Sequence, residues 1–251
     1  MGEFDGRVAL VTGAAGAGIG RATAQRLATE GAAVVVTDSH ERRTKEVSEA
    51  LRLKFGNRIV GHTLDISDRP RVDQVLEEVE AELGPVDILV NNAAINLLGS
   101  LSEYEPAVWD RVIDVDLNSS FYLIRQVLPG MIERRRGSIV NVSSVAGWLT
   151  GGGVEGPYAA AKAALMALTR SVAFEGGPFG VRCNAVAPGI IRSRFVEKRA
   201  AAFEQEIKRT PLRRLGEPED IANVIAFLCS EQSSFITGET VNASGGWYMR
   251  A

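Results

Sequence analysis

Short runs of β-branched and other apolar residues alternate along this chain with longer segments of helical periodicity, and this alternation constrains the fold more than any other feature. Runs such as residues 86–90 and 138–142 are apolar on both faces, which is typical of parallel strands covered by helices on both sides. Right-handed crossovers between such strands build a doubly wound sheet. The sequence therefore predicts an α/β fold, with about seven parallel strands and helices on both faces.

The expected strands lie at residues 7–12, 32–38, 58–65, 86–93, 137–144 and 181–188, with a short last strand within 238–246. Between them, the pattern predicts helices that include 19–31 and 41–55. No Pro/Ser-rich linker, low-complexity segment or fixed-period repeat interrupts the 251 residues. We therefore expect a single domain that spans residues 1–251.

Composition excludes several classes of function. A formal net charge of −3 argues against nucleic acid as a partner. No apolar run approaches the ~20 residues of a membrane span, and the first residues lead into a strand without a signal-peptide pattern. Two cysteines are too few for a disulfide framework or a zinc site, and the isolated His40 and His62 form no metal site or Ser-His-Asp triad. We expect a cytoplasmic protein that binds no metal, no membrane and no nucleic acid.

Polar residues and turn formers gather where the expected strands end. They are Thr12, Asp38, Asp65, Asn91, Asn92, Ser143, Ser144, Pro188 and Gly189. In a doubly wound sheet, ligands bind beyond the carboxyl ends of the strands. The sequence therefore predicts a ligand site at that edge of the sheet.

A glycine-rich turn, residues 12–20, joins the first expected strand to the first expected helix. Its glycines let the backbone approach a pyrophosphate, which the helix N-terminus can bind. Asp38 follows Gly20 by eighteen residues, close to the spacing at which a carboxylate binds the adenosine ribose. Its charge would repel a 2′-phosphate, so the pattern favours NAD over NADP. Asp38 could instead cap the next helix. We interpret the nearby Arg42 and Arg43 as solvated surface charges, although an inward-turned helix would let them reach a phosphate.

Tyr158 and Lys162 stand four residues apart in an expected helix, so their side chains share one face. A free tyrosine titrates near pH ~10, and a neighbouring cation lowers a pKa by about one to three units. The pair can therefore make a proton donor and acceptor that works near neutral pH. Taken alone, the pair also fits an ordinary surface helix, so the other motifs decide between the two interpretations.

Several motifs follow one another in a fixed order: the glycine turn, Asp65 after the third strand, Asn-Asn-Ala-Ala at 91–94, Asn-Val-Ser-Ser at 141–144, Tyr-Ala-Ala-Ala-Lys at 158–162 and Ala-Pro-Gly at 187–189. In this order they resemble the classical short-chain dehydrogenases/reductases, in particular the 3-oxoacyl-thioester reductase-like branch. The resemblance covers nearly the whole chain. It implies a single Rossmann-type domain, a nicotinamide dinucleotide cofactor and hydride transfer at a CH–OH group.

The resemblance also implies a role for each matching residue. Tyr158 is expected to be the general acid/base, Lys162 to lower its pKa and bind the nicotinamide ribose, and Ser144 to hydrogen-bond the substrate oxygen. Together with Asp38, the expected cofactor contacts are Gly13, Gly18, Ile19, Gly20, Asp65, Ile66, Asn92, Ala93, Ala94, Tyr158, Lys162, Pro188, Gly189 and Ile191.

Two departures from the family pattern concern spacing. The glycine turn is one residue longer than usual within residues 15–17, and we expect it to bulge without moving the start of the helix. Ser144 lies fourteen residues before Tyr158, one more than is common, and the glycine-rich loop between them can absorb the difference.

The third departure concerns a catalytic position. Asp116 occupies the place of an Asn that, in the family, anchors a water chain to the lysine. Asn118 lies roughly 200° further round a regular helix and cannot replace it. We therefore include Asp116 among the candidate catalytic residues, as a relay that would also oppose deprotonation of the tyrosine.

Residues 190–215 correspond to the substrate-covering helical segment of the family. The segment carries eight basic and three acidic side chains in a chain of net charge −3. This excess suggests a phosphate-bearing substrate such as a coenzyme A thioester, although a solvated amphipathic helix explains it at least as well. The apolar C-terminal residues Trp247, Tyr248 and Met249 would be unfavourable if exposed. Because tetramers are usual in the family, we expect a homotetramer with these residues at an interface or near a neighbour's active site.

The function that follows is an NAD-dependent dehydrogenase that interconverts a secondary alcohol and a ketone, with a 3-hydroxyacyl or related thioester as the small-molecule substrate. An NADP-dependent 3-oxoacyl-thioester reductase is the main alternative. A non-catalytic dinucleotide sensor is a second alternative, supported only by the Asp116 substitution.

Overall fold

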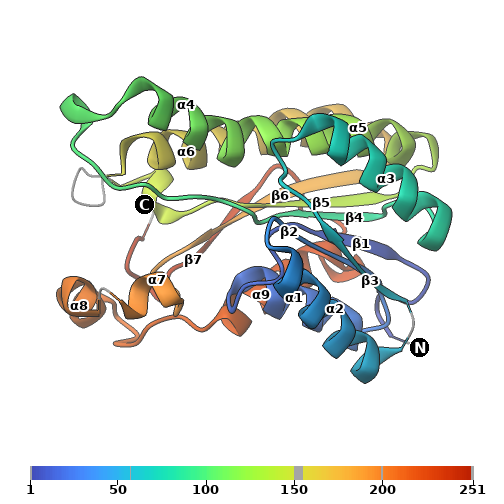
Figure 1. Ribbon diagram of the computed structural model, residues 1–251, viewed down its shortest axis with the longest axis horizontal. Helices are drawn as coiled ribbons and strands as arrows, with labels where there is room; N and C mark the ends of the chain where they lie inside the picture. Colours follow the sequence, from blue (N-terminus) through green and yellow to red (C-terminus); the bar gives the residue numbers. More distant parts are fainter. Residues whose placement is uncertain (1, 57, 150–154, 199, 250–251) are drawn as a thin grey trace.

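The computed structural model describes residues 2–56, 58–149, 155–198 and 200–249. Within these ranges, seven parallel strands form one sheet in the order β3-β2-β1-β4-β5-β6-β7 (Figure 1). The strands are β1 (Val8–Val11), β2 (Ala33–Asp38), β3 (Ile59–Thr63), β4 (Ile88–Asn91), β5 (Gly137–Val142), β6 (Val181–Pro188) and β7 (Thr240–Ala243). The strand order runs outward in both directions from β1, which confirms the predicted doubly wound, Rossmann-type architecture.

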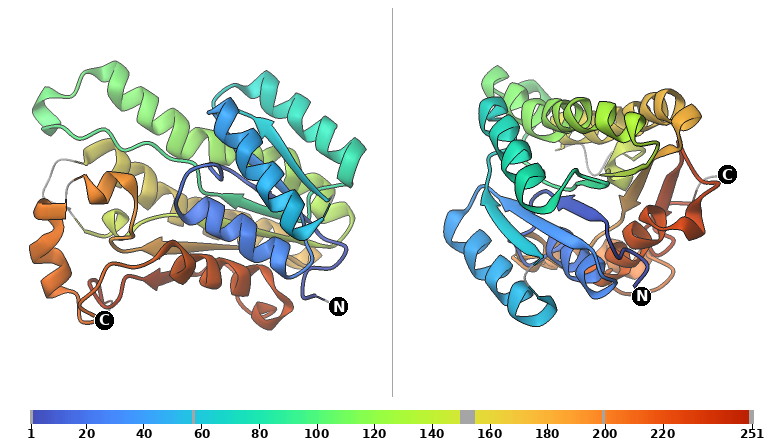
Figure 2. Two further views of the ribbon diagram at one scale, coloured as in Figure 1. Left: turned by 60° about the horizontal axis from the view of Figure 1, so that its bottom comes forward. Right: turned by 90° about the vertical axis from the view of Figure 1, so that its right-hand side faces the viewer.

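Helices cover both faces of the sheet, as Figures 1 and 2 show. One layer contains α1 (Ile19–Thr29), α2 (Glu41–Phe55) and α9 (Pro218–Cys229), and the other contains α3 (Arg69–Leu83), α4 (Pro106–Ile113), α5 (Ser119–Glu133) and α6 (Gly156–Gly176). Successive residues of a strand point to opposite faces. In β1, Ala9 and Val11 therefore pack into one hydrophobic core and Val8 and Leu10 into the other. This two-sided burial explains why the strands are apolar throughout.

The helix predicted at 41–55 is α2, and the first predicted helix begins at Ile19 as expected. That first helix ends at Thr29 rather than Gly31, whose φ of +96° belongs to the following turn. The N-cap of α2 is His40, whose side chain accepts a hydrogen bond from the Arg43 backbone N–H at 3.5 Å. Asp38 is therefore not the cap of this helix.

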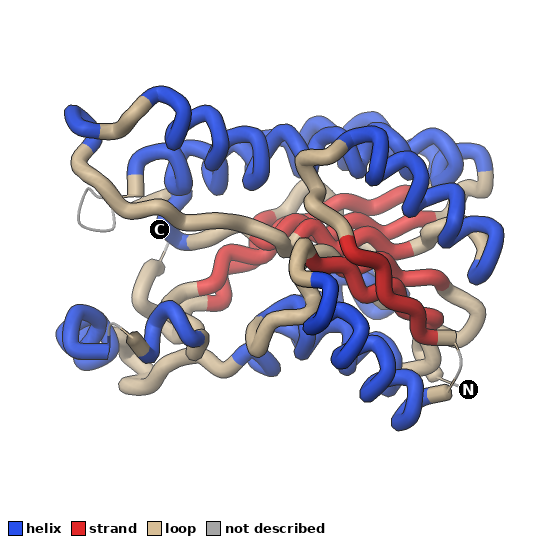
Figure 3. Tube along the Cα trace, in the orientation of Figure 1, coloured by secondary structure: helices blue, strands red, loops and turns tan. Residues whose placement is uncertain are grey.

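Residues 190–215 leave the sheet after β6 and contain two helices, α7 (Arg194–Glu197) and α8 (Ala200–Arg209). The two ends of the segment pair with each other, since Arg192 N–H donates to Gly216 O at 2.8 Å and Gly216 N–H donates to Ile190 O at 2.9 Å. Figure 3 shows this segment and the long loop after β4 at the same end of the sheet, beyond the carboxyl ends of the strands. The loops that can shape a ligand site therefore converge on one edge.

None of the helices in the described ranges combines the length and hydrophobicity needed to cross a membrane. Over the same ranges, no group of three or more His, Cys, Asp or Glu side chains is arranged to hold a metal ion. Cys183 and Cys229 are free thiols buried in the protein.

Candidate active site

Lys162 lies under the ring of Tyr158 in the first turns of α6. It is 2% exposed, and its Nζ lies 5.3 Å from the centre of the Tyr158 ring. The Nζ donates a hydrogen bond of 3.0 Å to the carbonyl oxygen of Val142, at the end of β5. The helical spacing thus places the ammonium beside the phenol, and the sheet backbone fixes its position.

Ser144 joins this pair from the loop after β5. Its Oγ accepts a hydrogen bond of 3.1 Å from Ala146 N–H in the short 3₁₀ turn η3 (Val145–Gly147), and its side chain is also hydrogen-bonded to Tyr158. A Cβ at Gly147 would lie 2.9 Å from the Ala163 backbone nitrogen, so only glycine allows η3 to pack this closely on α6. This close packing brings Ser144 to the phenol despite the longer spacing. Residues 150–154 of the connecting loop lie outside the described ranges.

Asp116 enters the site through a local widening of the helix. Between α4 and α5 the chain forms a π-helical turn, η2 (Asp114–Asn118), where the sequence predicted a regular helix. Such turns frequently occur at functional sites. Asp116 is fully buried, its Oδ1 accepts a hydrogen bond of 2.8 Å from Ile95 N–H, and its Oδ2 lies 3.7 Å from Lys162 Nζ. Asn118 is exposed and donates to Asp114, so it lies outside the cluster.

Burial dominates the protonation of this cluster. It raises the pKa of Asp116, an effect that the Lys162 ammonium counteracts, and it lowers the pKa of Lys162. Burial also raises the pKa of Tyr158; the Ser144 hydroxyl lowers this pKa, and the carboxylates of Asp116 and Glu155 raise it. The lowering of this pKa by Lys162, which was expected from the resemblance, stays a prediction. The phenol is held as a proton donor.

The glycine turn packs against the residues that follow β4. Gly13 has a φ of +62°, and a Cβ there would lie 2.9 Å from Ala93 Cα. The Thr12 hydroxyl accepts hydrogen bonds from Asn92 N–H at 2.9 Å and Ala93 N–H at 3.0 Å, while Asn92 Nδ2 donates to Thr12 O at 2.8 Å. These bonds join the two motifs into one rigid surface. Ala94 lies exposed at its edge.

The N-terminus of α1 opens from this surface without a side-chain cap. Its N-cap is Gly18, and within the described ranges no side-chain cap bonds the first N–H groups, which leaves them available to an anion. A Cβ at Gly20 would lie 2.5 Å from Asn92 Nδ2, so a larger residue would separate the helix from the Asn92 loop. In the lengthened turn Ala14 and Ala15 are buried, and the helix begins at Ile19.

Asp38 ends β2 and faces the glycine turn. Its Oδ2 accepts a hydrogen bond of 3.3 Å from Ala15 N–H, and its Oδ1 accepts one of 3.1 Å from His40 N–H. A guanidinium nitrogen of Arg43 lies 3.7 Å from Oδ1, and Arg43 Nε is buried with no hydrogen-bond partner among the described residues. Arg42 is 79% exposed and lies near Glu46. The interpretation as a solvated surface charge is therefore correct for Arg42, whereas Arg43, whose side chain is 38% exposed, is turned toward Asp38.

The remaining expected cofactor residues lie along the same edge. Asp65 Oδ1 accepts hydrogen bonds from the Ser67 backbone and hydroxyl, and its Oδ2 pairs with Arg111 at 2.9 Å. The Ile66 side chain is 5% exposed and packs in the core, so the backbone is the part of Ile66 that a ligand can reach.

The segment that follows Pro188 lies between β7 and the helices α7 and α8. Gly189 N–H donates to Ala243 O at 3.2 Å, and a Cβ at Gly189 would lie 2.9 Å from Ser244 Cα. Ile191 forms the bridge with Gly216. Glycine at 189 therefore permits the close approach of this segment to the end of β7.

Three groups at the site were not predicted from the sequence. Two are backbone groups, the Val142 carbonyl and the Ile95 N–H, which carry no residue-type signal. The third is Glu155, whose charge acts on Tyr158 and whose Oε1 accepts a hydrogen bond of 2.9 Å from Asn96. Its position three residues before Tyr158, one helical turn away, is a signal that could have found it.

These features fit a dinucleotide. The uncapped helix end suits a pyrophosphate, the glycine positions admit its close approach, and the buried Arg43 Nε and the Asp38 carboxylate provide a donor and acceptors for a ribose. Ser144, Tyr158 and Lys162 stand beyond the same strand ends and can hydrogen-bond and protonate a carbonyl oxygen.

Three comparisons connect the chain to known proteins. A family model described as enoyl-(acyl carrier protein) reductase matches residues 13–248. The chain is 40% identical to the 3-oxoacyl-(acyl-carrier-protein) reductase of Escherichia coli over 98% of this chain and 99% of that protein. It is 41% identical to a hexahydroindene-carboxyl-CoA reductase of Mycobacterium tuberculosis over 97% and 94% of the two chains. A crystal structure of a Brucella melitensis 3-oxoacyl-(acyl-carrier protein) reductase with bound NAD superposes with a TM-score of 0.88 at 39% identity, covering 98% of this chain and 92% of that one.

Proposed function

Because the chain belongs to the short-chain dehydrogenase/reductase family, we propose that it interconverts a secondary alcohol and a ketone with NAD(H), with a 3-hydroxyacyl or 3-oxoacyl thioester as substrate. Membership makes it an NAD(P)-dependent oxidoreductase that acts on CH–OH and keto groups. The observation that carries the proposal is the cluster of Ser144, Tyr158 and Lys162, which lies at the same carboxyl edge of the sheet as the uncapped N-terminus of α1.

Tyr158 is the proposed proton donor and acceptor. In ketone reduction its hydroxyl gives a proton to the carbonyl oxygen while the Ser144 hydroxyl donates a hydrogen bond to the same oxygen. In alcohol oxidation the phenolate takes the proton back. The Lys162 ammonium, 5.3 Å from the ring centre, stabilises the phenolate that ketone reduction leaves. A bound nicotinamide supplies or accepts the hydride.

We propose that the residues along the carboxyl edge of the sheet bind successive parts of the dinucleotide. We propose that Gly13, Gly18, Ile19 and Gly20 hold the pyrophosphate and that Asp38 binds the adenosine ribose. Further along the edge, Asp65 and Ile66 would contact the adenine, and Asn92, Ala93 and Ala94 would lie beneath the adenosine ribose. Pro188, Gly189 and Ile191 would flank the nicotinamide, and Tyr158 and Lys162 would hydrogen-bond its ribose.

A thioester substrate is supported by the relatives, whose names specify an acyl-carrier-protein thioester in one case and a coenzyme A thioester in another. The basic segment 190–215 gives weaker support than its charge count suggests. Three of its cations pair with carboxylates: Arg192 with Glu217, Lys208 with Glu204 and Arg214 with Asp220. Arg199 lies outside the described ranges.

The test of the cofactor proposal is a side-by-side binding titration with NADH and NADPH. We expect NADH to bind about tenfold more tightly, a difference of about 1.4 kcal/mol, because the Asp38 carboxylate repels a 2′-phosphate. Tighter binding of NADPH would mean that Arg43 outweighs Asp38. The NADP-dependent 3-oxoacyl-thioester reductase would then be the better assignment.

Asp116 is proposed as a relay residue that holds Lys162 and whose charge also acts on Tyr158. Its carboxylate raises the pKa of Tyr158, so Asp116→Asn is expected to lower that pKa. Alcohol oxidation requires the phenolate, so the acid limb of its kcat/KM profile should move to lower pH in the variant. Glu155→Gln removes the other carboxylate that acts on Tyr158 and should move the limb in the same direction. If the pH profile of Asp116→Asn is unchanged, the charge of Asp116 does not act on Tyr158, and its role is limited to the hydrogen bond with the Ile95 N–H.

We propose a homotetramer, as expected from the family. Not all of the apolar C-terminal residues are available for contacts between its subunits. The Tyr248 ring stacks on Trp148 of the same chain, with ring centres 5.1 Å apart. Met249 is 74% exposed and remains the best candidate for a contact with a neighbouring subunit.

A further inference from the structure

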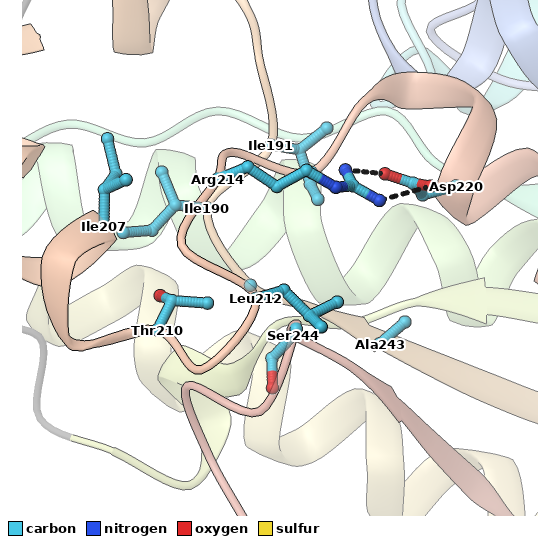
Figure 4. Close-up of a pocket in the computed structure, with 12 residues that line it drawn as sticks. Ile190, Ile191, Ile207, Thr210, Leu212, Arg214, Asp220, Ala243 and Ser244 are labelled. Carbon is cyan, nitrogen blue, oxygen red and sulfur yellow. Dashed lines mark hydrogen bonds and ion pairs between the residues drawn. The ribbon is translucent and has the colours of Figure 1, made fainter.

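A small cavity lies between the helix α8 and the carboxyl ends of β6 and β7 (Figure 4). Its volume is about 170 Å³. Ile190, Ile191, Ile207, Leu212 and Ala243 give it an apolar lining, and Figure 4 shows their side chains arranged around one space. An apolar cavity of about 150 Å³ is large enough to bind benzene.

The polar groups of the cavity wall are already bonded to the protein. Arg214 and Asp220 are the charged residues of the lining, and their side chains pair with each other through bonds of 2.6 Å and 3.1 Å. The Thr210 hydroxyl donates to Glu206 O at 2.9 Å, and the Ser244 hydroxyl bonds the backbone of Tyr248. Because these polar groups already have partners within the protein, the apolar part of the lining favours a hydrocarbon over a polar or charged ligand.

Glycine packing and backbone bonds keep the cavity open. Gly246 has a φ of +86°, and a Cβ there would lie 2.7 Å from Pro211 Cγ. Leu212 N–H donates to Gly245 O at 3.2 Å, which fastens the C-terminal segment to the end of segment 190–215. Because bonds between backbone groups hold these walls together without a ligand, the space is preformed.

The cavity adjoins the proposed reaction site on two sides. Gly189 and Ile191, which we propose to flank the nicotinamide, belong to its lining. Ser244 on the opposite side leads within four residues to Tyr248, whose ring stacks on Trp148 of the loop that carries Ser144. The cavity is therefore continuous with the segment that we propose to flank the nicotinamide.

We propose that this cavity is a binding site for a single six-membered hydrocarbon ring, which makes the substrate a ring-bearing acyl thioester rather than a long straight-chain one. The substrate half of this proposal rests on the proposed function. The volume admits one ring, and the neutral, internally bonded wall selects an apolar one.

Benzene is the probe for the cavity itself. We expect saturable changes in the methyl NMR signals of Ile190, Ile191, Ile207 and Leu212 when benzene is added to the protein. Ala243→Leu fills the cavity from the sheet side and should weaken benzene binding about tenfold or more. Ala50→Leu, at an exposed position of α2, is the matched control and should bind benzene like the parent. Absence of saturable changes at these methyl groups would overturn the proposal.

A pair of thioesters tests the substrate. We expect kcat/KM to be about tenfold higher for the benzoylacetyl than for the straight-chain butanoylacetyl thioester of N-acetylcysteamine, and Ala243→Leu to abolish that ratio. Leu212→Trp fills the cavity from the opposite wall and should also abolish the ratio. Leu53→Trp, at an exposed position, is its control and should leave the ratio unchanged. A ratio unaffected by both cavity variants would overturn the substrate assignment. Turnover of neither thioester, with benzene binding intact, would instead overturn the proposed function.

Discussion

Replacement of Tyr158 by Phe is expected to lower kcat/KM for ketone reduction by about 10²- to 10⁴-fold, the usual contribution of a positioned proton donor. The variant removes the hydroxyl and keeps the ring that lies over Lys162. Cofactor affinity should change far less than turnover, because the glycine turn, Asp38 and Asp65 are untouched. Steady-state kinetics with NADH, together with a binding titration of NADH, measure the two quantities separately.

Tyr122→Phe is the matched control for this variant. Tyr122 also carries a hydrogen-bonded hydroxyl, but its partner is Asp73 on α3 at 2.8 Å, away from the cluster around Lys162. The control should retain nearly the parent kcat/KM. Turnover that survives in Tyr158→Phe at the parent level would contradict the proposed mechanism. A comparable loss in both variants would show that the effect arises from folding rather than from proton transfer.

The layered architecture could be predicted because it follows from local patterns. Strands buried on both faces must be apolar throughout, so the apolar runs at residues 86–90 and 138–142 were enough to predict two strands. The positions of Tyr158 and Lys162 were equally predictable, since a four-residue spacing on a helix has one geometric outcome. The distance of 5.3 Å between Lys162 Nζ and the centre of the Tyr158 ring follows from this spacing, so the rest of the fold was not needed to predict it.

What the sequence did not predict depends on contacts between elements distant in the chain. The effect of Asp116 on Tyr158 was predicted, but burial and Glu155 also raise the pKa of Tyr158, and both are properties of the assembled site. The π-helical turn at Asp114–Asn118 has no signature in its residue types, yet it turns Asp116 toward Lys162. Arg43 likewise depends on how α2 rotates against β2. In each case the position or the pKa of the side chain depends on residues that are distant in the sequence and become neighbours only in the folded protein.

The environment of Asp38 leads to the second large expected effect, a change of cofactor preference in Asp38→Asn. In the parent protein a 2′-phosphate would meet the Asp38 carboxylate, which is 13% exposed and therefore only partly screened by water. Two charges at about 4 Å interact by about 4 kcal/mol at an effective dielectric constant of 20. Even half of this energy corresponds to a shift of about thirtyfold in the ratio of NADPH to NADH affinity.

Arg43 should determine how far the preference moves. Its Nε is buried and has no partner among the described residues, so the guanidinium can donate to a phosphate once the competing carboxylate is gone. We therefore expect Asp38→Asn to favour NADPH, and the double variant Asp38→Asn/Arg43→Ala to lose that gain. Arg42→Ala, which removes the neighbouring solvated arginine, should leave the ratio close to its parent value because the Arg42 side chain is 79% exposed. If Asp38→Asn binds both cofactors in the parent ratio, the carboxylate does not face the ribose, and its bond with Ala15 serves only to hold the glycine turn.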